Sequence, residues 1–363
     1  MSAENYMQMA LDLAAKGQGF TSPNPLVGAV VVKNGQVVGC GYHKAAGLPH
    51  AEINAIKDAK ELARGADLYV TLEPCNHMGR TPPCTRAIIE AGISRVFVAM
   101  LDPNPKVCGG GCRFLKEQGI IIKTGILEKA AQKQNEFFIK FVKTGHPFVI
   151  LKWAATLDGQ IATSSGNATW VTGPAARQVG HQIRHAVDAV LVGIGTVKAD
   201  NPSLTTRLDG KTGKDPIRVI LDSRLSIAPD ARLLSQKSNA ITMLAAGKNV
   251  NQQKKDALEK KGIKILTIPL VNGFLDFHAL LDQLGRLEIT SMLIEGGGQV
   301  NASALKAGIV DKVVCFYGPK IFGGNDGVPV CMGKGPDLMK DSIQVKNIQA
   351  QLIDNDIMVE GYL

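Results

Sequence analysis

Short apolar runs alternate with segments of helical character along most of the chain, and this alternation limits the possible folds more than any other feature. The runs Val27–Lys33, Asp67–Leu72 and Arg95–Leu101 are rich in branched and aromatic residues, which favour strands. Between them, Ala51–Ala63 carries apolar residues at helical spacing, and Thr85–Ala91 is a second helix-like segment that a glycine follows. Strands that alternate with helices predict an α/β fold, in which helices pack on a sheet.

The chain has 363 residues, which is more than one compact core usually holds. Thr144–Pro147 is the most turn-like stretch in the middle, and an apolar strand follows it at once. We therefore expect one domain over residues 1–145 and a second over residues 146–363. In the second domain the pattern predicts strands at Phe148–Trp153, Ala189–Gly193, Arg218–Asp222, Lys264–Ile268, Ser291–Glu295 and Lys312–Tyr317, and helices at Pro174–Ala186, Gln252–Lys261 and Gln299–Ala307.

Composition excludes several classes of protein. Apolar residues make up 45% and charged residues 20% of the chain, which is typical of a soluble globular protein and excludes a disordered one. No apolar run reaches the roughly 18–20 residues of a membrane span, and the acid-containing N-terminal segment indicates an amphipathic helix rather than a signal peptide. Seven cysteines, an odd number, favour reduced thiols in the cytoplasm over a disulfide framework. The net charge of +9 suits anionic ligands or a lysine-rich surface.

Two short segments carry the ligands expected of a catalytic zinc site. His50 stands immediately before a predicted helix, and Cys75 and Cys84 flank a segment that runs from a strand end into the next helix. Catalytic zinc takes three protein ligands and keeps a fourth position for water. One imidazole and two thiolates fit that number and cancel the formal charge of the metal. The helix dipole at Cys84 also favours its thiolate.

Glu52 lies two residues after His50, so the two side chains point in different directions on a helix. We expect Glu52 beside the metal, where its carboxylate can take a proton from the attacking water and pass it to a departing amine. Nucleobase deaminases combine H-x-E with P-C-x-x-C in these roles. Here the second part reads P-C-x₈-C, so the match is in roles and not in spacing. The two segments predict a hydrolytic deaminase.

Other interpretations of these polar residues stay open. The cysteines could hold a structural zinc or be buried as small apolar groups, and His77 could be a fourth ligand that closes the site. Asn24 could bind the edge of a pyrimidine or simply form the Pro-Asn-Pro turn. His43 is interpreted as structural. Cys108 and Cys112 frame three glycines and are interpreted as incidental cysteines of a turn.

In the second domain, the strand Met292–Glu295 runs into the glycines Gly296–Gly298 and then into a helix from about Gln299. Glycines there let the backbone approach an anion, and free N–H groups at the helix start could hold a phosphate. The same residues could form only a tight strand–helix turn. The G-x-G-x-x-G pattern of a Rossmann fold is absent from this segment.

Several longer motifs resemble one family throughout the chain. TSPNPLVGAVVV, GYHKAAGLPHAE, VTLEPCNHMGRTPPC and VAMLDPNP are similar to the deaminase half of the bacterial bifunctional enzymes of riboflavin biosynthesis. These enzymes join a diaminohydroxyphosphoribosylaminopyrimidine deaminase to a 5-amino-6-(5-phosphoribosylamino)uracil reductase. LKWAATLDGQIAT, WVTG, GIGTVKADNPSLTTR and LIEGGG are similar to the reductase half, in the same order.

The resemblance implies a cytidine-deaminase-like α/β/α domain followed by a dihydrofolate-reductase-like α/β domain. It implies one zinc on His50, Cys75 and Cys84, with Glu52 as the catalytic proton shuttle. It also implies that NADPH reduces the ribosyl group of a phosphorylated pyrimidine to a ribityl chain. The implied NADPH residues are Ala154, Trp170, Thr196, Asp200, Ser223, Gly297 and Gly298. The implied substrate residues are Arg184, Leu204, Arg207, Glu295 and Ala168.

Ala168 departs from the family pattern, in which a serine hydroxyl would contact substrate, so Thr169 or Asn167 takes over that contact or the contact is missing. The main alternative is a zinc-dependent nucleic-acid base deaminase with an accessory binding domain. It leaves the strand–Gly-Gly-Gly–helix element unexplained, and no basic and aromatic stripe for stacking bases is visible. We therefore expect a cytoplasmic enzyme with no nucleic-acid or membrane partner, which forms a homo-oligomer.

Overall fold

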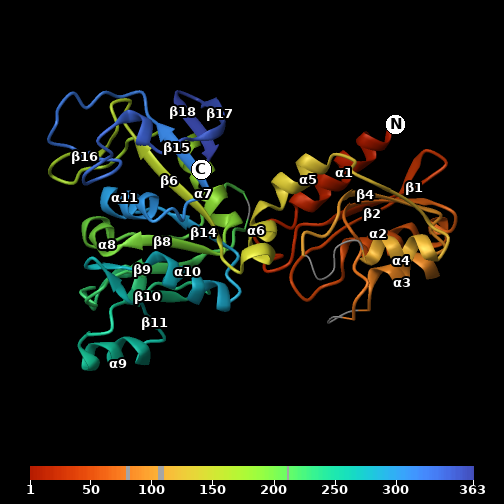
Figure 1. The fold of residues 1–363 in the computed structure, drawn as a ribbon, viewed down its shortest axis with the longest axis horizontal. Coiled ribbons are helices and arrows are strands. Elements are labelled where there is room, and N and C mark those ends of the chain that lie inside the picture. The colour runs from red at the N-terminus through yellow and green to blue at the C-terminus, as the bar shows by residue number, and fades with distance from the viewer. Residues whose placement is uncertain (79–81, 105–109, 211) are drawn as a thin grey trace. The chain divides into compact units, whose positions relative to one another are not determined.

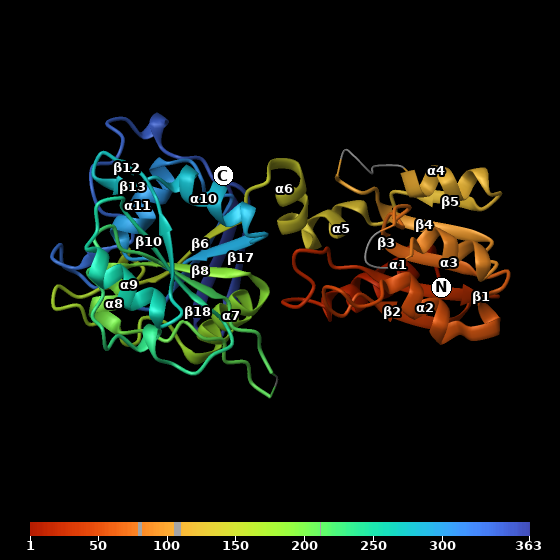
Figure 2. The ribbon, with the colours of Figure 1, turned by 90° about the horizontal axis from the view of Figure 1, so that it is seen from below.

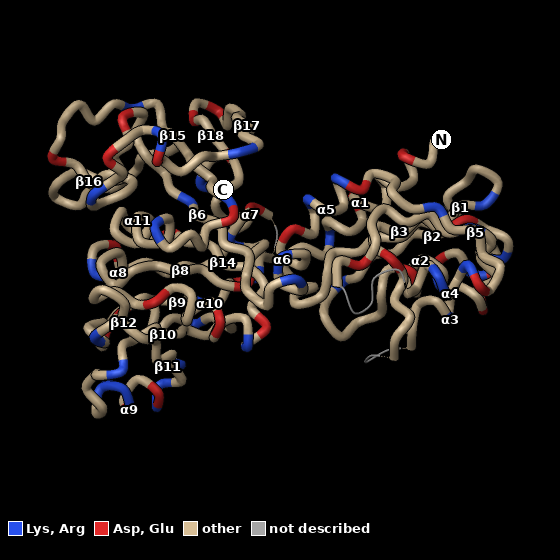
Figure 3. The backbone as a smooth tube through the Cα atoms, in the orientation of Figure 1, with Lys and Arg blue, Asp and Glu red and all other residues tan. Residues whose placement is uncertain are grey.

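The computed structural model describes residues 1–78, 82–104, 110–210 and 212–363. These residues form two compact units, Met1–Gly145 and His146–Leu363, each with its own sheet (Figure 1). Among the described residues, no helix has both the length and the apolar character needed to cross a bilayer. Figure 3 shows Lys and Arg interspersed with Asp and Glu over the elements of both units, so the positive net charge is not collected in one segment.

The first unit is built on a five-stranded sheet in the order β2-β1-β3-β4-β5. The strands are β1 (Gly28–Lys33), β2 (Gln36–Tyr42), β3 (Asp67–Leu72), β4 (Arg95–Met100) and β5 (Ile121–Thr124). β1 is antiparallel to both of its neighbours, whereas β3, β4 and β5 are parallel to one another. The loops after β3 and β4 therefore leave the sheet at the same edge.

Helices cover both faces of this sheet (Figure 1). They are α1 (Ala3–Ala15), α2 (Ala51–Ala59), α3 (Cys84–Glu90), α4 (Gly110–Glu117), α5 (Glu128–Gln134) and α6 (Glu136–Thr144). α1 begins at a capping box, in which the side chains of Ser2 and Asn5 accept each other's backbone N–H. A Cβ on Gly28 would lie 1.9 Å from the carbonyl oxygen of Ala10, so only glycine allows α1 to pack this closely on β1.

The second unit has a nine-stranded sheet in the order β11-β10-β9-β8-β14-β6-β15-β18-β17. Its parallel strands are β6 (Phe148–Ala155), β8 (Ala189–Gly193), β9 (Ile217–Leu221), β10 (Thr242–Ala246), β11 (Lys264–Thr267), β14 (Ser291–Ile294) and β15 (Lys312–Tyr317). β18 (Asp356–Tyr362) and β17 (Lys346–Ile353) continue the sheet in antiparallel fashion. The short strands are β7 (Gln160–Ala162), β12 (Leu270–Val271), β13 (Phe274–Leu275) and β16 (Val328–Pro329), which pair as β7–β16 and β12–β13.

Alternate residues of the parallel strands face two separate apolar cores. Ala189 and Leu191 of β8 belong to one core, and Val190 and Val192 belong to the other. The first core is covered by α10 (Phe277–Arg286) and α11 (Gly298–Lys306). The other face carries α7 (Pro174–Ala186), α8 (Ile194–Asp200) and α9 (Gln252–Lys260), as Figure 2 shows. Both faces of the sheet are thus buried, as a parallel sheet requires.

The predicted α/β architecture is confirmed in both units. The predicted strands occur close to their expected bounds, and the helix expected at Ala51–Ala63 ends at Ala59 and continues as the 3-10 turn Lys60–Ala63. The unpredicted elements include β2, α8, α10 and β17. β2 contains glycines that lower its strand signal. β17 alternates apolar Ile348, Ala350 and Leu352 with polar residues, although it is exposed along almost its whole length.

Candidate active sites

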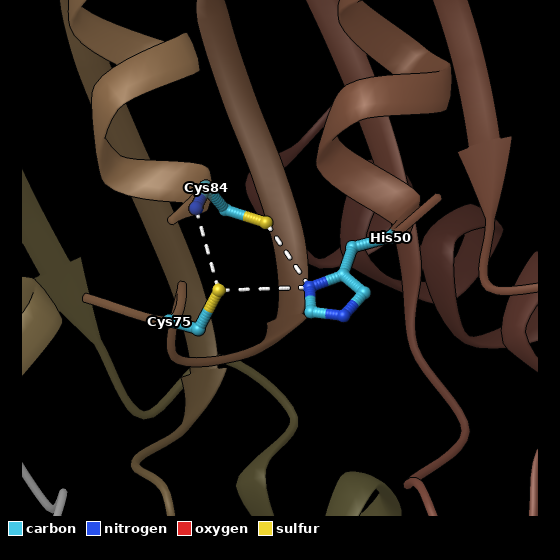
Figure 4. A group of neighbouring side chains, drawn as sticks. All are labelled: His50, Cys75 and Cys84. Atoms are coloured by element: carbon cyan, nitrogen blue, oxygen red, sulfur yellow. Dashed lines mark hydrogen bonds between the residues drawn. The ribbon is translucent and has the colours of Figure 1, made fainter. Parts of the chain in front are cut away.

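Three predicted ligands come together in the first unit. Nδ1 of His50 lies 3.2 Å from Sγ of Cys84 and 3.6 Å from Sγ of Cys75 (Figure 4). The ligand atoms of these three residues all lie within 4.8 Å of one another. Tetrahedral zinc with one nitrogen and two sulfur ligands places the nitrogen about 3.5 Å from each sulfur. The donor set and its spacing therefore fit zinc.

Local backbone structure brings these ligands together. His50 is the N-cap residue of α2 and Cys84 is the first residue of α3, while Cys75 lies in the loop that follows β3. The backbone N–H of Cys84 donates to Sγ of Cys75 at 3.3 Å, which fixes that sulfur at the start of α3. A Cβ on Gly41 would lie 2.4 Å from the carbonyl oxygen of Ala51, so glycine in β2 allows the first turn of α2 to approach the sheet.

The charges of the site are strongly coupled. The hydrogen bond between the two thiols lowers the pKa of Cys75 to about 4 and raises the pKa of Cys84. Glu52 is 3% exposed, and burial followed by the charge of Cys75 raises the pKa of its carboxyl to about 7. Glu52 stands in the first turn of α2 but outside the group of ligands, as the H-x-E spacing leads one to expect.

Hydrogen bonds that involve Asn24, His43 and Pro49 hold the segment that precedes His50. Nδ1 of His43 lies 3.2 Å from the carbonyl oxygen of Pro49, and Nε2 lies 3.1 Å from the amide nitrogen of Asn24. A neutral ring that donates from Nδ1 and accepts at Nε2 satisfies both contacts, and burial lowers the pKa of His43 accordingly. The two histidine rings meet edge to face at 5.4 Å between centroids. His43 thus fixes the segment just before His50, which agrees with its interpretation from the sequence as a structural residue.

The remaining polar residues of this unit lie as follows. His77 is exposed and is not part of the three-residue ligand group found among the described residues. Glu73, which sequence reasoning missed, is buried and accepts from the backbone N–H groups of Asp102 and Cys112 at 3.1 and 2.9 Å. It therefore holds the start of α4 against the loop that carries Cys75. Cys108 lies outside the described residues.

The second unit contains a cavity of about 530 Å³ at the carboxyl ends of β8, β9 and β14. This volume falls in the range of about 300–1,000 Å³ that is usual for ligand sites, and the carboxyl edge of a parallel sheet is where such sites form. The predicted site residues that line it are Ala168, Thr196, Asp200, Ser223, Glu295, Gly297 and Gly298. The strand–Gly-Gly-Gly–helix element is therefore part of its wall.

Glu295, which lines the cavity, is the centre of a buried charge cluster. Nε and Nη2 of Arg184 donate to its Oε2 at 2.9 and 2.6 Å, and Nζ of Lys152 lies 3.6 Å from its Oε1. Burial raises the pKa of Glu295, but the charges of Arg184 and Lys152 outweigh it, so the pKa lies below the ordinary value. Oε1 is buried without a hydrogen-bond partner among the described residues.

Four further predicted residues of this unit are not among those that line the cavity. Arg207 donates from its backbone N–H to Nδ1 of His181 at 3.3 Å. Leu204 is buried in an apolar core, and Ala154 lies in β6. Trp170 is 62% exposed, with the guanidinium of Arg177 at 4.2 Å from its ring centroid.

Lys152 and His181 are functional candidates that sequence reasoning missed. Lys152 stands in the middle of a predicted apolar strand, and a lysine at that place was the only available signal. His181 lies on α7 together with Arg184, three residues apart and thus on the same helix face.

Comparisons with known proteins match each of the two units to a known domain. Residues 1–100 match the cytidine and deoxycytidylate deaminase zinc-binding region, and residues 147–359 match the RibD C-terminal domain. The riboflavin biosynthesis protein RibD of Bacillus amyloliquefaciens is 46% identical over 98% of this chain and 94% of its own length. RibD of Escherichia coli is 39% identical over 98% of both chains.

Solved structures give the same result. RibD of Acinetobacter baumannii superimposes with a TM-score of 0.90 at 36% identity, over 99% of this chain and 98% of its own. The diaminohydroxyphosphoribosylaminopyrimidine deaminase/5-amino-6-(5-phosphoribosylamino)uracil reductase of Thermotoga maritima superimposes with a TM-score of 0.85 at 38% identity, with the same coverage.

Fold, sites and comparisons define a protein in which a zinc-binding deaminase domain of the cytidine deaminase type precedes a reductase domain. The chain belongs to the RibD family, the bifunctional deaminase–reductases of riboflavin biosynthesis. Because the match extends over the second domain, the alternative of a nucleic-acid deaminase with an accessory binding domain is not supported.

Proposed function

We propose that this chain hydrolytically deaminates 2,5-diamino-6-(phosphoribosylamino)pyrimidinone and then uses NADPH to reduce the ribosyl group of the product to a ribityl chain. The observation that carries the first step is the group of His50, Cys75 and Cys84 with buried Glu52 beside it. The observation that carries the second is the cavity whose wall joins Glu295 to the Gly297–Gly298 turn.

His50, Cys75 and Cys84 would hold one zinc ion per chain. Zinc with three protein ligands would lower the pKa of a water molecule, so that this water can lose a proton and attack at neutral pH. Glu52 is held on the first turn of α2, so its carboxylate can accept the proton of the attacking water. It then delivers that proton to the amino group that leaves the pyrimidine carbon as ammonia. The Asn24–His43–Pro49 chain keeps His50 in its orientation throughout.

In the second unit, the start of α11 would bind the pyrophosphate of NADPH. A Cβ on Gly298 would lie 2.5 Å from the carbonyl oxygen of Pro329, so this turn must stay free of side chains to keep its shape. The backbone N–H groups of Gly297 and Gly298 open the helix at the cavity wall, where a phosphate is favoured by the helix dipole. Thr196, Asp200 and Ser223 line the same cavity and would form the rest of the cofactor site. The exposed Trp170 and the strand residue Ala154 are the two cofactor residues proposed from the resemblance alone.

The substrate would lie where the charge cluster meets the cavity. Oε1 of Glu295, which has no hydrogen-bond partner among the described residues, would accept from a ribose hydroxyl, and Arg184 fixes the other carboxylate oxygen. The exposed side chain of Arg207 would bind the substrate phosphate, because a guanidinium forms paired hydrogen bonds to phosphate oxygens. The side chain of Leu204 is buried, so only its backbone can reach the substrate. Ala168 lines the cavity without a hydroxyl to offer.

A homo-oligomer stays a prediction, and one feature supports it. β17 is the last strand of the sheet and carries Ile348 and Leu352 at 61% and 76% exposure. An exposed edge strand with apolar side chains is a typical surface for pairing with a second copy. Light scattering on the purified protein would give its mass. A cytoplasmic location is likewise proposed, on the basis of free cysteines such as Cys40 and Cys315.

One assay tests both catalytic steps. The protein is supplied with the diaminopyrimidine phosphate, with and without NADPH, while ammonia release and NADPH absorbance are followed. Ammonia should appear in both cases, and NADPH should be oxidised only after ammonia has appeared. NADPH oxidation without prior ammonia would contradict the order, and no ammonia from zinc-loaded protein would contradict the deaminase. Arg207→Ala should raise KM for the phosphorylated substrate, and an unchanged KM would contradict its proposed role.

A further inference from the structure

The carboxyl ends of four parallel strands form a row along the cavity side of the second unit. The sheet order β10-β9-β8-β14 and the registers Ala245–Leu221, Leu221–Gly193 and Leu191–Ile294 fix their sequence in space. Neighbouring strands lie about 4.8 Å apart, so the end of β10 is about 14 Å from the end of β14. A dinucleotide bound in this cavity would lie along the ends of β9, β8 and β14, because residues that follow these three strands line it, and β10 is the next strand of the row.

The position of the charge cluster orients that dinucleotide. Glu295 follows β14 and is held by Arg184, so the substrate end of the cavity is at β14. Hydride transfer requires contact, and the nicotinamide must therefore lie at this end. The pyrophosphate then lies at the Gly297–Gly298 turn, and the adenosine extends toward β9 and β10.

Two basic residues stand at that far end. Arg224 directly follows the cavity-lining Ser223 after β9, and Lys248 directly follows Gly247 after β10. The N–H of Gly247 donates to the carbonyl oxygen of Ser223 at 3.0 Å, so the two loops are in contact. Both basic side chains are exposed, and neither forms an ion pair with any described residue.

The acidic residue at this place is not available to a ligand. Sites that prefer NADH commonly use a carboxylate near the end of a strand to accept from the ribose 2′-hydroxyl, whereas a nearby basic residue accommodates the 2′-phosphate of NADPH. Asp222 occupies the strand end here, but it is 1% exposed. Its carboxylate accepts from the backbone N–H groups of Ser226 and Ile227 and from the hydroxyl of Ser226. It therefore caps its own loop.

We propose that Arg224 and Lys248 bind the 2′-phosphate of NADPH and thereby select NADPH over NADH. This inference rests on the proposed use of a nicotinamide dinucleotide in this cavity and goes beyond it, because it names the residues that set the choice between the two cofactors. A guanidinium and an ammonium from adjacent loops bracket a dianionic phosphate, and NADH lacks the group that they bind.

The test is calorimetric titration of NADPH and of NADH into the full-length protein and into R224A, K248A and the double variant. Wild type should bind NADPH at least about tenfold more tightly than NADH, since a charge-assisted hydrogen bond contributes about that factor. Each single variant should reduce the ratio of the two dissociation constants, and the double variant should bring it near one while NADH affinity stays within about twofold. K264A is the matched control, because Lys264 is exposed at the amino end of β11, on the opposite edge of the same sheet.

Each outcome separates this proposal from the function on which it rests. A double variant that keeps the wild-type ratio overturns the role of Arg224 and Lys248 but leaves NADPH binding intact. Equal binding of both cofactors by wild type also overturns it, because the 2′-phosphate would then contribute nothing to affinity. Failure of wild type to bind either cofactor contradicts the proposed reductase cofactor itself.

Discussion

Arg184 donates two hydrogen bonds, of 2.9 and 2.6 Å, to a single carboxylate oxygen of Glu295. The side chains are 18% and 8% exposed, so the pair is largely removed from water. The arrangement leaves the second oxygen of Glu295 buried without a hydrogen bond, beside the ammonium of Lys152 at 3.6 Å. One oxygen of Glu295 is thus held by Arg184, while the other, near Lys152, has no hydrogen bond among the described residues.

Removing one member of this pair should destabilise the second unit. Arg184→Met leaves the buried carboxylate of Glu295 short of its main partner, and we expect the free energy of unfolding to fall by about 3 kcal/mol. The double variant R184M/E295M should recover much of that loss, because no unpaired charge is left. Both tryptophans of the chain, Trp153 and Trp170, lie in this unit, so urea denaturation followed by tryptophan fluorescence reports on it selectively. Equal stability of R184M and wild type would contradict the expectation.

Glu295 should also contribute a pH-dependent part of this stability. Burial raises the pKa of Glu295, but Arg184 and Lys152 lower it further, to below the ordinary 4.5. A native pKa below the unfolded one means that the stabilisation is complete above about pH 4.5 and is lost as the pH falls through the native value. Glu295→Gln should therefore flatten the fall in unfolding free energy below pH 4.5, measured by the same fluorescence titration. An unchanged slope would show that other carboxylates dominate there.

Glu52→Gln should separate metal binding from catalysis. The amide keeps the size of the side chain but cannot carry the proton, so we expect ammonia release to fall by about 10²–10⁴-fold. Zinc content, measured by elemental analysis, should stay near one per chain, because Glu52 lies outside the ligand group. Glu61→Gln, at an exposed position in the turn that follows α2, is the matched control and should leave both quantities unchanged. Loss of zinc in E52Q would instead make Glu52 a ligand or a support of the ligands.

The sequence predicted the three ligands of the deaminase site but not the contacts that support them. A histidine and two cysteines in such short segments indicate a metal site, and the helix starts at His50 and Cys84 have clear local signals. The support from Asn24 and His43 depends on a contact between two loops, which no local pattern records. Lys152 was missed for the same reason: its partner Glu295 directly follows β14, a strand that only the sheet order brings beside β6. β17 alternates Ile348, Ala350 and Leu352 with polar residues, so its sequence carried a strand signal that was missed.

Ala168→Ser should restore a substrate contact in the reductase. Ala168 lines the cavity, and a hydroxyl at this position could donate to the substrate, as the family resemblance implies for a serine there. We expect KM for the deaminated substrate to fall by about two- to tenfold with kcat nearly unchanged, as for one added hydrogen bond. KM for NADPH, measured in the same assay, is the internal control and should not move. An unchanged KM for the substrate would mean that Thr169 or Asn167 already makes this contact, and a rise would contradict the expectation.

His181 should be neutral throughout the working pH range of the reductase. Burial, followed by the positive charges of Arg184 and Arg207, lowers the pKa of its imidazole to about 4. The Nδ1 atom accepts from the backbone N–H of Arg207, which also requires an unprotonated nitrogen. In a histidine-labelled sample, the ring signals of His181 should therefore not titrate between pH 5.5 and 8. Because Arg207→Ala removes one of the cations, its pKa should rise toward the ordinary 6.5, whereas Arg232→Ala, at an exposed position elsewhere in the unit, should leave it unchanged. A wild-type titration midpoint near pH 6.5 would mean that neither burial nor the two arginines control the pKa of His181. The proposed substrate site around Arg184 and Arg207 would then lose this support.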